Sequence, residues 1–147
     1  MLNVVLAPDV FVNASLALGS PPDQVVQRVL GNHKGECKCS EWVMERVGAM
    51  LAAVPSFKKE AVDSQLTLIR QFVQVIKDDE PRAPDAWEAS LVALAKAAGV
   101  KRVITDHPDL LQKESSEGID FISTEVWLVE QAIPPMPPER ISKMPPK

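Results

Sequence analysis

The most informative segment of the chain is Pro84-Asp-Ala-Trp-Glu-Ala-Ser-Leu-Val-Ala-Leu-Ala-Lys-Ala-Ala-Gly-Val-Lys-Arg-Val-Ile-Thr-Asp-His-Pro-Asp-Leu-Leu111. Its first half, residues 84–98, carries apolar side chains at helical spacing, and Gly99 is placed to end that helix. Residues 102–105 are short, β-branched and bounded by polar residues, which predicts a buried strand. A polar loop with two carboxylates, residues 105–109, follows directly. Because ligands of α/β proteins bind at the carboxyl ends of strands, a metal or polar substrate is expected there.

Short apolar runs alternate with capped helices along the rest of the chain. This alternation predicts a three-layer α/β/α sandwich with a mostly parallel, five-stranded sheet, covering residues 1–132. The strands are predicted near residues 3–6, 36–39, 72–76, 102–105 and 119–122. The helices are predicted at residues 10–18, 21–31, 40–51, 55–70, 84–98, 109–112 and 124–132, with Ser20, Ser40 and the pair Ser123-Thr124 as caps. Residues 133–147, rich in proline, predict an extended tail.

Composition and charge narrow the class of protein. A chain of 147 residues with 46% hydrophobic and 24% charged residues is typical of one soluble globular domain. The net charge of −4 provides no overall attraction to nucleic acid, so RNA binding would need a local basic patch or metal ions. Residues 2–7 predict a strand rather than a signal peptide, and no apolar segment reaches membrane-spanning length. We therefore expect a cytoplasmic protein.

The two cysteines, Cys37 and Cys39, occur in a predicted strand, so both thiols point to the same face. With His33 nearby they could contribute to a metal site, but zinc sites usually need four ligands at wider spacing. We expect two buried, free thiols. The tryptophans Trp42, Trp87 and Trp127 lie in amphipathic helices and are expected in the core or at an interface, with base stacking as the alternative.

The quoted stretch resembles the PIN domain, a family of small metal-dependent nucleases. The matching residues are Ala97-Ala98-Gly99, Thr105 and Asp109-Leu110-Leu111, and the order of elements over residues 2–132 also agrees. The resemblance implies carboxylates that converge on one or two Mg²⁺ or Mn²⁺ ions, with a metal-bound water as the nucleophile.

Two of the family's acids have clear counterparts, and the first one is missing. Ser40-Glu-Trp-Val-Met-Glu45 matches a family helix motif, so the resemblance assigns Glu45 to the catalytic set, and Asp109 matches the trailing acid. The first family Asp, at the end of the first strand, corresponds to Ala7. Asp9 occupies the family's Asn position, on the same strand face but about 6–7 Å further along an extended chain.

Two further family acids are displaced. The Asp near the start of the fourth main helix corresponds to Ala89, and its neighbour Glu88 is rotated by about 100° around the helix. The family's Thr-Gly-Asp becomes Thr105-Asp106-His107, which moves the carboxylate back by one position and puts an imidazole in its place. Imidazole is a poorer ligand than carboxylate for a hard cation.

Two functional hypotheses follow. In the first, the chain is a catalytically degenerate PIN-like protein that binds RNA or protein, needs no metal or other cofactor, and acts through its cleft, a homodimer face or its Pro-rich tail. In the second, it is an active Mg²⁺- or Mn²⁺-dependent endoribonuclease, as in toxin-type PIN proteins, that uses displaced acids. Asp9, Glu45 and Asp106 would then hold the metal, and Asp109 and Glu88 would complete the candidate catalytic set. The same acids could also be solvated surface charges.

Overall fold

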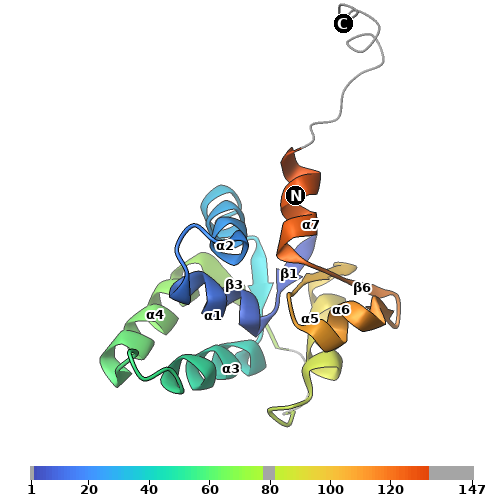
Figure 1. Cartoon of the computed structure of the whole chain (residues 1–147). Coiled ribbons are helices and arrows are strands. Elements are labelled where there is room, and N and C mark those ends of the chain that lie inside the picture. Colours follow the sequence, from blue (N-terminus) through green and yellow to red (C-terminus); the bar gives the residue numbers. More distant parts are fainter. Residues whose placement is uncertain (1, 78–81, 133–147) are drawn as a thin grey trace, which may run out of the picture.

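The computed structural model describes residues 2–77 and 82–132, which form seven helices and six strands (Figure 1). The predicted tail, residues 133–147, lies outside the described residues. In chain order the elements are β1 (Val4–Leu6), α1 (Pro8–Leu16), α2 (Pro21–Asn32), β2 (Cys37–Cys39), α3 (Glu41–Ala52), α4 (Lys59–Phe72), β3 (Val73–Val75), α5 (Trp87–Ala98), β4 (Arg102–Ile104), α6 (Pro108–Lys113), β5 (Ser115–Ser116), β6 (Ile119–Ile122) and α7 (Thr124–Ala132).

The protein is α/β with mostly parallel strands. The main sheet has the order β1-β4-β6-β5, in which β4 runs parallel to both of its neighbours and β5 is antiparallel to β6. In its register Val5 lies opposite Val103, and Val103 lies opposite Phe121. A separate parallel pair, β2 and β3, packs beside β1.

The prediction of one five-stranded sheet is therefore wrong. All five predicted strands occur, but β1, β4 and β6 belong to a four-stranded sheet while β2 and β3 form a two-stranded sheet. The strands β1 and β2 are only three residues long and lie close together without a shared hydrogen-bonded ladder. The fourth strand of the main sheet, β5, is a two-residue element, too short to produce a readable alternation.

Three helices begin at other residues than predicted, for local reasons. α1 starts at Pro8, because proline is tolerated in a first turn. α4 starts at Lys59 rather than residue 55, since the backbone before it turns, with Phe57 N–H bonded to Val54 O. α5 starts at Trp87 rather than residue 84, after a turn around Pro84-Asp85. Its predicted end is confirmed: Gly99 adopts a left-handed φ of 74°, which glycine takes at low cost.

The predicted caps are partly confirmed. The Ser40 hydroxyl accepts a hydrogen bond from Val43 N, and the Ser123 hydroxyl accepts one from Val126 N. Ser20 occupies the N-cap position of α2, but its hydroxyl donates to Ala17 O instead of capping. Asp23, in the first turn of α2, accepts from Gly19 N and so ties the helix to the turn before it.

A continuous apolar core joins the two sheets to the helices. β1 is buried along its whole length, which is why its sequence is apolar without alternation. α5 packs on β1 and β4, and Trp42 and Trp127 are buried as expected. Among the described helices none is long and apolar enough to cross a membrane. This packing places the carboxyl ends of β1 and β4 side by side, next to the start of α1.

Candidate functional site

The carboxyl edge of the main sheet brings Asp9 and the loop after β4 together. Asp9 is the second residue of α1 and only 8% exposed. Its Oδ1 accepts a hydrogen bond of 2.8 Å from the Thr105 hydroxyl, and its Oδ2 accepts one of 2.8 Å from Asp106 N. The Thr105 hydroxyl in turn accepts from His107 N at 3.0 Å. Both oxygens of Asp9 therefore have protein donors.

The carboxylate of Asp106 also accepts hydrogen bonds within the protein, further along the same edge. Its Oδ1 accepts from Thr124 N at 2.9 Å, and its Oδ2 accepts from the Thr124 hydroxyl at 2.7 Å. Thr124 is the first residue of α7, so the carboxylate of Asp106 pairs with a free amide and the positive end of that helix. We call Asp9, Thr105, Asp106 and Thr124 the edge network. It ties α1, β4 and α7 together.

Burial perturbs the pKa of one member of the edge network, Asp9. It raises the pKa of Asp9 above its usual value, because the ionised carboxylate loses its hydration there. The hydrogen bonds from Asp106 N and Thr105 lower that pKa, and the nearby Asp106 charge raises it, so the net shift is upward. The ionised Asp9 carboxylate therefore loses hydration free energy on burial. Two neutral donors offset part of this loss, and among the described residues no cation pairs with it.

Aromatic rings lie next to this edge. The His107 ring stacks on Trp87 with a centroid distance of 4.8 Å, and Trp87 meets Trp42 edge to face at 5.8 Å. The Trp42 Nε1 donates to Ala83 O, which holds the segment before α5. Within the described part of the chain His107 Nδ1 is buried and has no hydrogen-bond partner. Where the resemblance implies a carboxylate, the protein therefore has a ring packed against another ring.

Glu88 and Asp109 lie outside the edge network. Glu88 forms an ion pair with Lys113 at 2.9 Å and accepts a hydrogen bond from the Ser116 hydroxyl at 2.7 Å. These two contacts, Lys113 first, lower the pKa of Glu88. Asp109 is exposed in the first turn of α6, where a carboxylate suits the helix dipole. Ala89, where the resemblance implies an acid, is exposed in the first turn of α5.

Glu45 lines a hollow whose lining includes neither Asp9 nor Asp106. It is exposed on α3, and the hollow, of about 570 Å³, lies between α3 and α4; we call it the α3–α4 groove. The groove is mostly apolar, with charges at its rim, and its lining residues are Met44, Glu45, Gly48, Ala49, Ala52, Phe57, Lys59, Val62, Asp63, Leu66 and Arg70. Among the described contacts of Glu45, no hydrogen bond or ion pair joins it to Asp9 or Asp106.

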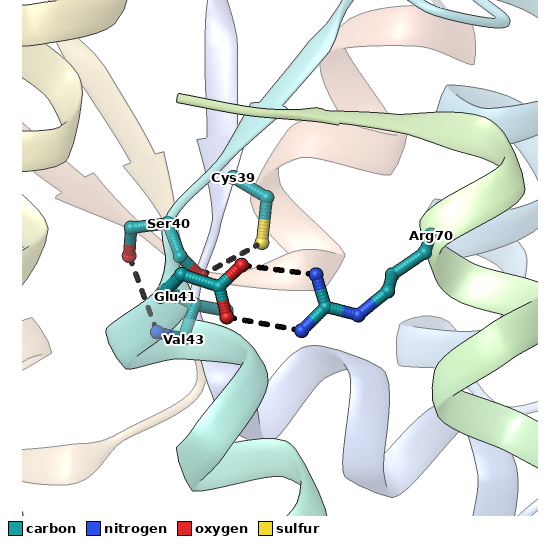
Figure 2. Close-up of polar contacts among 5 residues, drawn as sticks. All are labelled: Cys39, Ser40, Glu41, Val43 and Arg70. Carbon is teal, nitrogen blue, oxygen red and sulfur yellow. Dashed lines mark hydrogen bonds and ion pairs between the residues drawn. The ribbon is translucent and has the colours of Figure 1, made fainter. Parts of the chain in front are cut away.

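One end of the groove is held by an ion pair, shown in Figure 2. Arg70 of α4 donates through both terminal nitrogens to the two carboxylate oxygens of Glu41, each at 3.0 Å. This contact lowers the pKa of Glu41 and fixes the start of α3 beside the end of α4. The cap of α3 by Ser40 lies beside it (Figure 2).

The expected free thiols are confirmed, because Cys37 and Cys39 are both buried and unbridged. Burial raises the pKa of Cys37 to about 12 and that of Cys39 further still, so neither is a reactive thiolate at neutral pH. His33, the third candidate ligand near them, is bonded to Glu36 instead. These residues are structural.

The side chains present do not fit the metal centre that the resemblance implies. In residues 2–77 and 82–132 no three His, Cys, Asp or Glu side chains converge as metal ligands would. The four oxygens of Asp9 and Asp106 already accept hydrogen bonds from Thr105, Thr124 and backbone amides. Ala7 and Ala89 stand where the resemblance implies two acids, and Glu45 lines the α3–α4 groove.

Sequence reasoning missed two features of this region. It treated Thr105 as a motif match and Thr124 as a cap, without assigning them to the acids. The signal was present, because a threonine that follows a buried strand can hydrogen-bond a carboxylate on the neighbouring strand's end. The α3–α4 groove had no local signal. No protein-family model, curated protein or solved structure matches the chain.

Proposed function

We propose that the chain is a PIN-like, three-layer α/β/α protein that binds another protein or peptide and does not hydrolyse nucleic acid. The net charge of −4 and the mostly apolar α3–α4 groove favour a protein ligand over RNA. Two free, buried cysteines favour a reducing compartment such as the cytoplasm.

One observation carries the proposal: both carboxylates at the sheet edge are used internally. A catalytic Mg²⁺ or Mn²⁺ needs several converging carboxylates, plus open positions for water and phosphate. Asp9 and Asp106 instead hold one protein donor on each oxygen, an arrangement that stabilises the fold, and among the described residues no third His, Cys, Asp or Glu converges with them. The edge network therefore has the properties of a structural link between α1, β4 and α7, and not those of a metal site.

The first test measures metal binding through stability. Unfolding is followed by circular dichroism with increasing Mn²⁺ or Mg²⁺, since a ligand that binds only the folded state raises the melting temperature once it exceeds its dissociation constant. We expect no metal-dependent shift for the natural sequence. Combining Ala7→Asp, Ala89→Asp and His107→Asp is expected to create such a shift, provided that the variant retains the circular dichroism spectrum of the parent.

The second test measures cleavage of single-stranded RNA with Mg²⁺ or Mn²⁺. We expect no cleavage by the natural sequence. Robust cleavage that Glu45→Ala abolishes would refute the proposal and support an endoribonuclease with displaced acids. That alternative is favoured by one observation, the direct hydrogen bond between Asp106 N and Asp9, which brings two carboxylates to one edge. If the natural protein bound RNA without cleaving it, and Asp9→Asn abolished that binding, the proposed ligand would be RNA instead of a protein.

A further inference from the structure

The α3–α4 groove has the composition of a peptide-binding site. Its floor includes the apolar side chains of Met44, Phe57, Val62 and Leu66. α3 and α4 come close at Gly48, where an added Cβ would lie 3.2 Å from Leu66 Cδ1. A small residue on α3 therefore keeps the hollow open above Leu66.

The rim carries charges that the described part of the protein leaves unpaired. Arg70 is neutralised by Glu41. Glu45, Asp63 and Lys59 have no ion pair or side-chain hydrogen bond within residues 2–77 and 82–132. Two free acids against one free base give the rim an excess of negative charge. The chemistry that fits is an apolar segment flanked by cations.

We propose that this groove binds residues 133–147 of the same chain. That segment reads Ile-Pro-Pro-Met-Pro-Pro-Glu-Arg-Ile-Ser-Lys-Met-Pro-Pro-Lys and places Ile141 and Met144 directly beside Arg140 and Lys143. The apolar side chains match the floor, and the two cations match the excess of acid at the rim. Proline-rich segments pay little conformational entropy on binding, which suits them to such grooves. The inference is independent of the acid site, but it rests on the proposed peptide binding in this groove and names a segment of the same chain as the peptide.

The segment is long relative to the domain. Figure 1 shows α7, which ends at Ala132, on the opposite side of the view from α3 and α4. In polyproline II geometry residues 140–144 extend about 25–37 Å from Ala132, and the whole segment extends about 46 Å. A compact domain of this size has a diameter of roughly 35 Å, and the segment has to run over its surface rather than through it. The match of charge and apolar side chains, rather than length, therefore carries the proposal, and binding within one molecule makes the groove self-occupied.

The experiment uses two charge-reversed full-length variants and two labelled peptides. One variant carries Arg140→Glu and Lys143→Glu, and the other carries Glu45→Lys and Asp63→Lys. The peptides span residues 133–147 with the natural charges or with the same Arg140→Glu and Lys143→Glu changes. Binding is measured by fluorescence anisotropy at low salt. We expect the first variant to bind the natural peptide and the second to bind the reversed peptide, each about tenfold or more tightly than the natural protein does.

The control is Glu60→Lys with Glu125→Lys, the same change of charge at exposed positions outside the groove lining. It should bind both peptides as weakly as the natural protein. Failure of the first variant to bind the natural peptide would overturn the inference, as would binding that survives Glu45→Lys with Asp63→Lys. If the natural protein sedimented as a dimer and either charge-reversed variant sedimented as a monomer, the groove would bind a second copy of the chain instead. None of these outcomes alters the metal and cleavage tests.

Discussion

The sheet edge and the α3–α4 groove treat their carboxylates in opposite ways. At the edge, Asp9 is buried and each of its oxygens has a donor within the protein. In the groove, Glu45 and Asp63 are exposed around an apolar floor, and the described residues supply no cation or donor to them. The two regions hold similar side chains under different physical constraints.

Mutations in these two regions are expected to change different properties of the protein. A buried carboxylate with satisfied oxygens is costly to remove, because its donors lose their partners. An exposed carboxylate without a partner contributes little to the fold and remains free for a ligand. Mutations at the edge should therefore change stability, while mutations in the groove should change affinity.

The largest effect is expected for Asp9→Ala. It leaves the Thr105 hydroxyl and Asp106 N without their acceptor in a buried location, which should lower the free energy of unfolding by about 2–4 kcal/mol. Urea unfolding followed by circular dichroism measures it. Glu45→Ala is the matched control, with an expected change below about 0.5 kcal/mol. Equal losses for both variants would contradict the contrast.

The second-largest expected effect is a pH dependence of stability that comes from the titration of Asp9. Because the folded protein raises the pKa of Asp9 above 3.8, its protonated form is favoured in the folded state, so stability from this group falls as pH rises through the raised pKa. Asp9→Asn removes that titration. We expect the stability of the natural protein relative to Asp9→Asn to decrease from pH 4 upward and then level off.

Urea unfolding of both proteins at pH values between 4 and 7 checks this. Surface acids such as Glu41 have a lowered pKa and change stability in the opposite direction, but they are common to both proteins and cancel in the difference. A difference that is constant with pH would show that Asp9 is not perturbed by burial.

A smaller effect is expected for Gly48→Ala in the groove. Alanine favours a helix interior over glycine by about 1 kcal/mol, but its Cβ would press on Leu66 at 3.2 Å, so the two terms should nearly cancel. The added methyl narrows the groove. We expect a several-fold loss of peptide binding in the Arg140→Glu, Lys143→Glu background, with a melting temperature close to that of the parent. A large loss of stability would mean that α3 and α4 cannot shift enough to accommodate the added methyl group.

The smallest effect is expected for Arg70→Ala. It removes the pair with Glu41, which is substantially exposed on both sides, so screening limits the loss of stability to less than about 1 kcal/mol. The loss should shrink further in 0.5 M salt. The measurement is urea unfolding at low and high salt, with Lys96→Ala, which breaks the exposed pair with Glu117, as the matched control. A loss that salt leaves unchanged would indicate packing rather than charge.

Much of the fold was readable from local sequence. The β-branched run at residues 102–105 and the glycine at 99 marked a strand and a helix end, because both depend on short-range preferences. Which strands share a ladder was not readable. β2 lies beside β1 yet pairs only with β3, since pairing depends on the orientation of segments far apart in the chain.

The same limit applies to the site. Strand ends placed Asp9 and Asp106 at one edge, and the structure joins them by a hydrogen bond. Their donors are distributed over the chain, and Thr124 lies 18 residues after Asp106. The surroundings of Glu45 depend on how α4 packs against α3, which no residue near Glu45 encodes.

The register of the main sheet has a consequence for synthesis of the chain. Val4 pairs with Arg102, so β1 cannot acquire its neighbour until β4 has been translated. Contacts this distant in sequence form slowly, because a long loop must close before they stabilise anything. Until then β1, which is wholly apolar, depends on helices and β2 for cover. A ribosome that stalls before β4 emerges would expose an aggregation-prone strand, so the newly made chain should need chaperone protection from the synthesis of β1 until that of β4.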